Sequence, residues 1–188
     1  MKTRIILDLC GGTGAWGRPY QVAGYDYRLI TWPKNDVRLY VPPRGVHGIL
    51  AAPPCTQFSY AKHIHNCGKT PDFLTGLETV SACMRIILTA RPVWWALENP
   101  VGHLSTWLGR PLFVFDPWEF GDPYSKRTAI WGRFNPPVKT ESIAPAGLRD
   151  FSKLEAWELP NGPGKLKRSD RRSITPTGFA NAFYEVNP

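Results

Sequence analysis

The sequence contains no long apolar run that would indicate a membrane protein. No stretch approaches the roughly 20 apolar residues that a membrane-spanning helix needs. The apolar run at residues 5–9 is too short for the core of a signal peptide, and no small-residue cleavage site follows it. We therefore expect an intracellular, cytoplasmic protein without a membrane association.

Cysteine is also sparse, and its spacing indicates neither a disulfide scaffold nor a metal site. The sequence has four cysteines, which we expect to be reduced thiols in an intracellular chain: Cys10, Cys55, Cys67 and Cys83. His63, His65 and Cys67 alternate along the chain, but residues two apart point to opposite sides of an extended segment. No second pair of ligands follows at the usual spacing, so we expect no metal.

Acidic residues are fewer than basic ones, which favours a polyanionic partner. The chain carries 23 lysines and arginines against 15 acids, a net charge of +8, and nucleic acid is the usual partner of such a surface. Many soluble proteins are mildly basic, so charge alone leaves the partner open. With 188 residues, the chain suits one domain with a single core.

The hydrophobic pattern predicts an α/β fold. We expect buried strands at residues 5–9, 27–32, 46–52, 93–97, 112–115 and 128–134, and helices at 16–22, 72–90 and 178–184. Strands that alternate with helices indicate a mostly parallel sheet with helices on both faces. Ligands of such sheets bind at the carboxyl ends of the strands. The polar motifs discussed below all follow predicted strands.

Residues 135–173 differ from the rest because they are rich in proline, glycine and charge and show no sustained period. We expect a short, irregular basic insert packed on a single domain that spans residues 1–188. Its basic residues would contact nucleic-acid phosphates, or they form a solvated loop: Lys165, Lys167, Arg168, Arg171 and Arg172.

A glycine-rich loop follows the first predicted strand, with the sequence Asp8-Leu-Cys-Gly-Gly-Thr-Gly14. Glycines allow the backbone to approach a ligand, and the start of the next helix supplies amide donors. The spacing departs from the dinucleotide fingerprint, and Thr31 and Trp32 stand where that motif requires an acid. An acid at the end of the first strand suits a ligand with an ammonium group, such as S-adenosylmethionine. The alternative is a purely structural turn.

Cys55 follows Pro53 and Pro54 at the expected mouth of the sheet. The prolines hold the chain extended, and the basic residues of the following loop could favour the thiolate that a nucleophile requires. Most cysteines are inert buried thiols, which is the better interpretation of Cys10 and Cys83.

Glu98 and Asn99 follow the strand predicted at residues 93–97. A carboxyl group in a largely apolar pocket would have a raised pKa and could donate a proton; a helix cap or a surface acid is an equal alternative. Arg127, which precedes the last predicted strand, could bind a pyrimidine carbonyl or be a solvated surface arginine.

The order of these motifs resembles that of the cytosine-5 DNA methyltransferases. It consists of the glycine loop, Pro54-Cys55, Glu98-Asn99, Arg127 before a strand, and a terminal Gly178-Phe-Ala-Asn-Ala. The resemblance covers most of the chain outside residues 135–173. It implies a Rossmann-like, S-adenosylmethionine-dependent methyltransferase fold that flips its target base out of the duplex.

The resemblance also implies a role for individual residues. Cys55 would attack carbon 6 of cytosine, Glu98 would protonate ring nitrogen 3, and Arg127 would hold the base carbonyl. The implied cofactor-binding residues are Asp8, Cys10, Gly11, Gly12, Gly14, Trp16, Trp32, Asp36, Pro53 and Asn181. The implied substrate-binding residues are Pro54, Thr56, Ser59, Asn99 and Lys126.

Several positions depart from the family pattern. Thr56 stands in place of the usual glutamine, Pro100 in place of a valine, and Ser125 in place of a first arginine. Thr31 lies near the place of the acid that binds the cofactor ribose. Residues 135–173 are too few for an ordinary target-recognition domain, so we expect short sequence specificity or a protein partner that supplies recognition.

Three other functions stay open at this point. The same chemistry could act on a free cytosine nucleotide or on a single strand. A nucleic-acid-binding relative could have lost catalysis, although Cys55, Glu98 and Arg127 are all present. A dinucleotide-dependent oxidoreductase is the most distant alternative.

Overall fold

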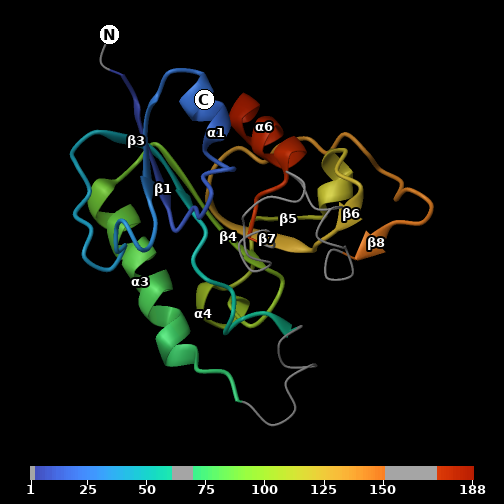
Figure 1. The fold of residues 1–188 in the computed structure, drawn as a ribbon, viewed down its shortest axis with the longest axis horizontal. Coiled ribbons are helices and arrows are strands. Elements are labelled where there is room, and N and C mark those ends of the chain that lie inside the picture. The colour runs from blue at the N-terminus through green and yellow to red at the C-terminus, as the bar shows by residue number, and fades with distance from the viewer. Residues whose placement is uncertain (1–2, 61–69, 151–172) are drawn as a thin grey trace.

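A six-stranded sheet forms the centre of the protein (Figure 1). The structure is a computed structural model that describes residues 3–60, 70–150 and 173–188. The strand order is β2-β1-β3-β4-β7-β5, with β1 (Ile5–Leu9), β2 (Asp26–Ile30), β3 (Val46–Ala51), β4 (Trp94–Pro100), β5 (Phe113–Phe115) and β7 (Thr128–Arg133). The helices are α1 (Arg18–Val22), α3 (Phe73–Ala90), α4 (Ser105–Leu108), α6 (Thr177–Val186) and the 3-10 helix η1 (Pro117–Phe120).

The sheet is mainly parallel, as predicted. Strand β1 pairs in parallel with β2 and β3, and β3 with β4, whereas β7 runs antiparallel to both β4 and β5. From β1 the chain moves outward to β2 and then returns to β3 on the other side of β1. Such a reversal opens a crevice at the carboxyl ends of the strands, where ligands of these sheets bind.

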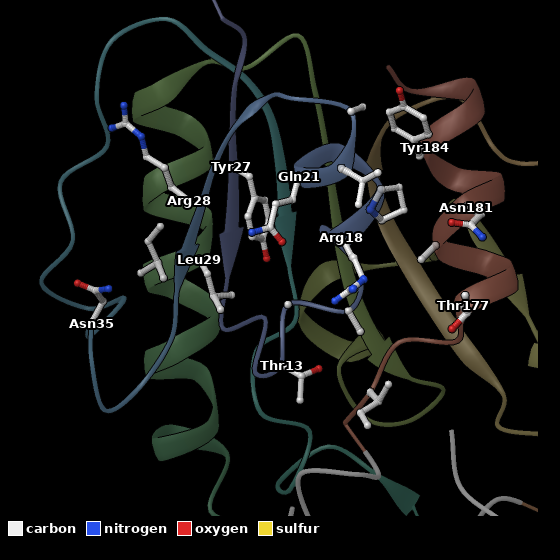
Figure 2. A pocket seen from close by; sticks show the side chains of 18 of the residues that line it. Thr13, Arg18, Gln21, Tyr27, Arg28, Leu29, Asn35, Thr177, Asn181 and Tyr184 are labelled. Carbon is white, nitrogen blue, oxygen red and sulfur yellow. The ribbon is translucent and has the colours of Figure 1, made fainter. Parts of the chain in front are cut away.

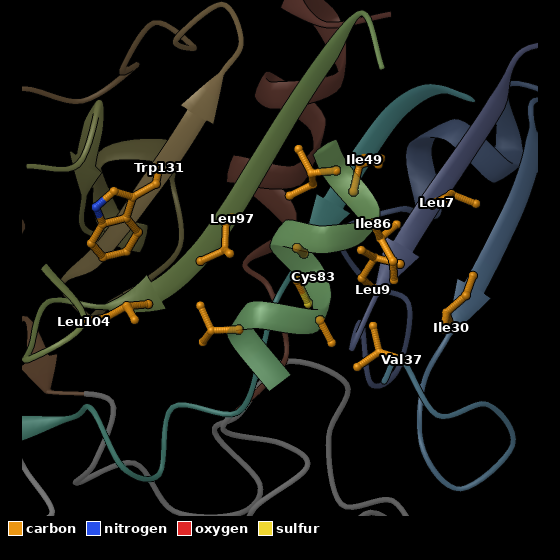
Figure 3. Packing of buried hydrophobic residues seen from close by; sticks show 14 of the residues in the cluster. Leu7, Leu9, Ile30, Val37, Ile49, Cys83, Ile86, Leu97, Leu104 and Trp131 are labelled. Atoms are coloured by element: carbon orange, nitrogen blue, oxygen red, sulfur yellow. The ribbon is translucent and has the colours of Figure 1, made fainter. Parts of the chain in front are cut away.

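Helices cover both faces of the sheet, which confirms the predicted layers. Alternate residues of each strand point to opposite faces. One face packs Leu7, Ile49 and Leu97 against the buried side of α3 (Figure 3). The other face, with Ile6 and Ala96 at its centre, packs against α1 and α6.

Helix α3 has the bounds that its apolar spacing predicts. At its start the Asp72 carboxylate accepts the backbone amide of Thr75 at 3.1 Å and its hydroxyl at 2.6 Å. The helix ends at Arg91, which adopts a left-handed conformation (φ 48°) directly before Pro92. Among the helices that the structure describes, α3 alone is long and apolar enough, by length and composition, to cross a membrane. Its buried face, however, packs on the sheet like that of a core helix.

Some elements differ from the sequence prediction: α4, η1 and β6 (Tyr124–Ser125) were not predicted, and β2 ends at Ile30 rather than at residue 32. Strand β4 continues through Glu98 and Asn99 to Pro100, because these residues pair with β7 rather than forming a loop. Helix α1 begins only at Arg18, because Trp16 lies in the preceding turn and is buried in the core. Within the insert, β8 (Arg149–Asp150) pairs with β6.

Candidate functional site

The predicted site residues come together where β1, β3 and β4 end. The glycine loop at residues 10–14 follows β1, and residues 53–59 follow β3. Because these strands are neighbours in the sheet, the two loops lie at the same edge. Glu98 and Asn99 occupy the end of β4 beside them, and they face opposite sides of the sheet because strand side chains alternate.

Asp8 lies directly beneath the glycine loop. It is fully buried, and a Cβ atom added to Gly11 would lie 2.2 Å from its Oδ1. The loop can therefore cross the carboxyl group only with glycine at this position. Burial raises the pKa of Asp8 from 3.8 to about 7, although hydrogen bonds from the Tyr27 hydroxyl and the Gly17 amide lower it. Within the described chain, Oδ1 has no hydrogen-bond partner.

A pocket of about 1470 Å³ opens beside the glycine loop (Figure 2). Its walls come from the loop itself, from α1 and β2, and from α6. Thr13 and Gly14 form its edge at the loop, Lys34 and Asn35 lie beyond the end of β2, and Asn181 lies on α6. The pocket therefore adjoins the crevice that the strand order predicts.

The other predicted cofactor residues are placed differently from one another. Cys10 is half-buried with a positive φ of 58°, and its amide donates to the Ile30 carbonyl at 2.8 Å. Trp16 is a core residue with 2% of its surface exposed, whereas Trp32 is 73% exposed. The Asp36 carboxylate accepts hydrogen bonds from the backbone amide and the guanidinium of Arg38.

S-adenosylmethionine fits this site at its amino-acid end. The backbone of the loop lies close over Asp8 because Gly11 has no side chain, and the unpartnered Oδ1 of Asp8 lies directly under it. Because the loop separates this oxygen from the pocket, the Asp8 carboxylate would attract a ligand ammonium group through the loop rather than by direct contact. Beyond β2 the pocket wall carries Lys34 and Asn35, and Asp36 is held by Arg38. This part of the pocket wall therefore supplies amide and ammonium groups.

The Cys55 loop is fixed to the segment that follows β4. The Asn99 side chain donates from Nδ2 to the Pro53 carbonyl at 2.9 Å, and both residues are buried. The His103 amide donates to the Phe58 carbonyl at 2.8 Å, and Ser59 forms an isolated bridge with Gly102. These contacts hold the loop from both of its ends.

Phe58 anchors the loop in the core. It is fully buried, and its ring lies parallel to Phe73 and edge-on to Trp107. The Cys55 carbonyl accepts the amides of Phe58 and Ser59, both at 3.0 Å, so the chain turns immediately after Cys55. As a result Cys55 is half-buried, while its neighbours Pro54 and Thr56 are exposed.

Glu98 lies near the end of β4 and has a shifted pKa. Burial raises the pKa of its carboxyl group, and the positive charge of Lys126 partly offsets this rise. Lys126 is half-buried, whereas the side chain of Arg127 is 70% exposed, with Nη1 3.6 Å from the Asp116 carboxylate. The geometry thus brings Lys126 to Glu98 and leaves Arg127 at the surface.

Asp116 organises this basic segment, and sequence reasoning missed it. Its Oδ1 accepts the Lys126 amide at 3.0 Å, its other oxygen faces Arg127, and its own amide donates to Glu119 at 2.7 Å. Asp116 and Glu119 form a capping box around η1. The Asp-Pro-Trp-Glu sequence carries the spacing of such a box and could have indicated it. Tyr27 was also missed, because its place in a predicted strand gave no signal of a polar role.

Some predicted residues lie outside the described residues. These are Lys165, Lys167, Arg168, Arg171 and Arg172 of the basic insert, and the pattern of His63, His65 and Cys67. In the parts of the chain that the structure covers, no cluster of potential metal ligands occurs.

Comparison with known proteins yields similarity to solved structures only. No protein-family model and no curated protein matches the sequence. A protein described as a DNA modification methyltransferase, encoded within an E. coli prophage, is 14% identical with a TM-score of 0.47; the match covers 87% of this chain and 56% of that one. The methyltransferase EhMeth of Entamoeba histolytica is 14% identical with a TM-score of 0.44, and the match covers 80% and 57%. The chain thus spans little more than half the length of these structures, and such similarity does not transfer function.

Proposed function

We propose that the protein transfers a methyl group from S-adenosylmethionine to carbon 5 of cytosine in DNA. The observation that carries the proposal is the arrangement of Cys55, Glu98 and Asp8 at the ends of three neighbouring strands. A nucleophile, a proton donor and a glycine-covered acid at one edge are the parts that this reaction requires. The order of motifs in the sequence supports the same reaction.

Each of the two central side chains has a distinct task. The Cys55 thiolate adds to carbon 6 of cytosine, while Glu98 donates a proton to ring nitrogen 3 and so makes carbon 5 nucleophilic. The raised pKa of Glu98 keeps this carboxyl group protonated closer to neutral pH. After carbon 5 is methylated, a base removes its proton and Cys55 leaves by elimination.

The remaining residues position these two groups and the ligands. Asn99 and Phe58 fix the Cys55 loop, and Lys126 places a positive charge near Glu98. Residues 11–14 and Asp8 would hold the amino-acid end of S-adenosylmethionine, which supplies the methyl group when bound. Arg127 is exposed and would contact the base carbonyl or a phosphate of the substrate.

The experiment that tests this function is a methyl-transfer assay with labelled S-adenosylmethionine. Duplex DNA, single-stranded DNA, RNA and free cytosine nucleotides are incubated in separate reactions, and labelled bases are identified after hydrolysis. We expect label on carbon 5 of cytosine in duplex DNA. Label on single strands or nucleotides alone would keep the chemistry and change the substrate. No transfer to any substrate would contradict the proposal.

A second assay tests the covalent step. With a duplex that contains 5-fluorocytosine, the fluorine on carbon 5 cannot leave as a proton does, so the adduct with Cys55 should persist through denaturation. Cys55→Ala should form no adduct, while Cys83→Ala, which removes a buried thiol of α3, should still form it. An adduct with Cys55→Ala would exclude Cys55 as the nucleophile.

A further inference from the structure

Tyr27 connects the edge of the sheet to the glycine loop. It lies on β2, and its hydroxyl donates to Oδ2 of Asp8 at 2.7 Å. Figure 2 shows its side chain among the residues that line the pocket. Burial, together with the nearby Asp8, raises the pKa of Tyr27, so the hydroxyl stays protonated and remains a donor.

The ring of Tyr27 also supports the loop from below. A Cβ atom added to Gly17 would lie 2.0 Å from the ring, and one added to Gly14 would lie 2.8 Å from the hydroxyl oxygen. The backbone therefore rests on the tyrosine at both positions. The Tyr27 side chain thus fills the space under the loop and donates a hydrogen bond to Asp8.

The hydrogen bond from Tyr27 engages only one of the two carboxylate oxygens of Asp8. Oδ2 is engaged by Tyr27, whereas Oδ1, which lies against Gly11, is buried without a partner in the described chain. An unpaired buried oxygen is costly, and an ammonium group above residues 11–14 would stabilise the charged carboxylate through the loop. Rotation of the carboxyl group would remove this oxygen from the loop, and Tyr27 prevents it.

We propose that Tyr27 is a positioning residue that orients Asp8 and the glycine loop toward the amino-acid end of the cofactor. The inference rests on the proposed function, since it concerns the same ligand. It adds that recognition of the ligand's ammonium group depends on a residue of β2 that acts through Asp8. The adenosine end of the ligand does not depend on it.

The ionisation of Asp8 provides a second measurable property. Among the described residues, the groups that interact with its carboxyl are the Tyr27 hydroxyl and the Gly17 amide. Because the pKa of Asp8 is about 7, an ammonium ligand should bind more tightly as the pH rises through 7. The Tyr27 hydrogen bond lowers this pKa, so its loss should move the change to higher pH.

The test measures equilibrium binding by calorimetry, without DNA and without turnover. The ligands are S-adenosylhomocysteine, which carries the amino-acid group, and 5′-methylthioadenosine, which lacks it. For Tyr27→Phe we expect S-adenosylhomocysteine to bind about tenfold more weakly at pH 7.5, equivalent to about 1.4 kcal/mol, with 5′-methylthioadenosine unchanged. The pH at which binding strengthens should also be higher than in the wild type.

Tyr25→Phe is the matched control. Tyr25 lies in the same segment, but its ring packs edge-on against Tyr20 and Tyr184, away from Asp8, so both affinities should match the wild type. Equal weakening of both ligands by Tyr27→Phe would show a merely structural role and overturn the inference, as would an unchanged affinity and pH profile. If the wild type bound neither ligand, the proposed function itself would fail. This outcome differs from those that overturn only the role of Tyr27.

Discussion

The Asn99 side chain donates a hydrogen bond of 2.9 Å to the carbonyl of Pro53, two residues before Cys55. This bond joins the end of β4 to the loop that follows β3. Asn99 is adjacent to Glu98 in the same strand, so the bond fixes the position of the Cys55 loop relative to Glu98. The buried carbonyl of Pro53 would otherwise lack this donor.

Asn99→Ala tests this connection. The substitution removes the donor and leaves a buried carbonyl unpaired, which should lower the free energy of unfolding by about 1–3 kcal/mol. The displaced loop should lower kcat much more than it changes the affinity for S-adenosylhomocysteine. Denaturant unfolding and methyl transfer measure the two effects. Asn135→Ala, which removes an exposed hydrogen bond to the Val186 carbonyl, should leave kcat within about twofold, following the near-neutral range of substitutions away from such features.

Gly102 provides a second test of the Cys55 loop. A Cβ atom at this position would lie 2.2 Å from the Phe58 carbonyl oxygen, so Gly102→Ala must push the backbone of the loop away. We expect loss of the covalent adduct with 5-fluorocytosine DNA and unchanged binding of S-adenosylhomocysteine. Gly24→Ala, where nothing lies within 4 Å, strains only its own backbone and should keep the adduct. Normal adduct formation by Gly102→Ala would show that the contact is dispensable.

Lys126 and Arg127 should differ in their effect on the pH profile. In the proposed reaction the protonated form of Glu98 is the active one, and its pKa is raised by burial and lowered by Lys126. Lys126→Ala therefore raises this pKa further, which moves the alkaline limb of kcat to higher pH. Arg127→Ala, at an exposed residue paired with Asp116, should leave the limb in place and raise KM for DNA. If the alkaline limb of kcat moved in Arg127→Ala and not in Lys126→Ala, Arg127 rather than Lys126 would be the cation that acts on Glu98.

Asp8 should make the stability of the protein depend on pH. Its pKa is about 7 in the folded protein and near 3.8 in the unfolded chain, so the folded state holds the proton more tightly between these values. Stability from this group is complete below pH 4 and falls as the pH rises to 7. The loss is on the order of 4 kcal/mol for three pKa units. In Asp8→Asn this fall in the free energy of unfolding with rising pH should be absent. Urea unfolding of both proteins at pH 4, 5.5 and 7 would measure the difference.

The sequence predicted the layers of the fold because they depend on periodicity. Apolar residues at helical spacing and the Asp72 and Arg91-Pro92 boundaries were sufficient for α3, and alternating burial was sufficient for β1 and β3. These signals are local. They specify which face of an element is buried but not which residue of a distant element it meets.

The contacts that build the candidate site are long-range, and for that reason the sequence did not reveal them. Tyr27 lies 19 residues from Asp8, and Asn99 lies 46 residues from Pro53. Strand β4 was predicted too short because its last three residues pair with β7, a partner that periodicity cannot identify. The prediction that Glu98 and Cys55 lie at one edge succeeded because parallel strands end together.

Because β7 is antiparallel to β4, the start of β7 lies at the edge of the sheet where β1, β3 and β4 end. Strands β1, β3 and β4 contribute the residues at their ends, but β7 contributes the residues just before it begins, Lys126 and Arg127. Successive residues of an extended chain point in opposite directions, so the alignment of Thr128 with Pro100 decides which of the two cations turns inward. Insertion or deletion of a single residue between β6 and β7 would exchange a primary amine for a guanidinium beside Glu98. The chemical character of the surroundings of Glu98 therefore depends on the length of a turn as much as on the identity of the residues in it.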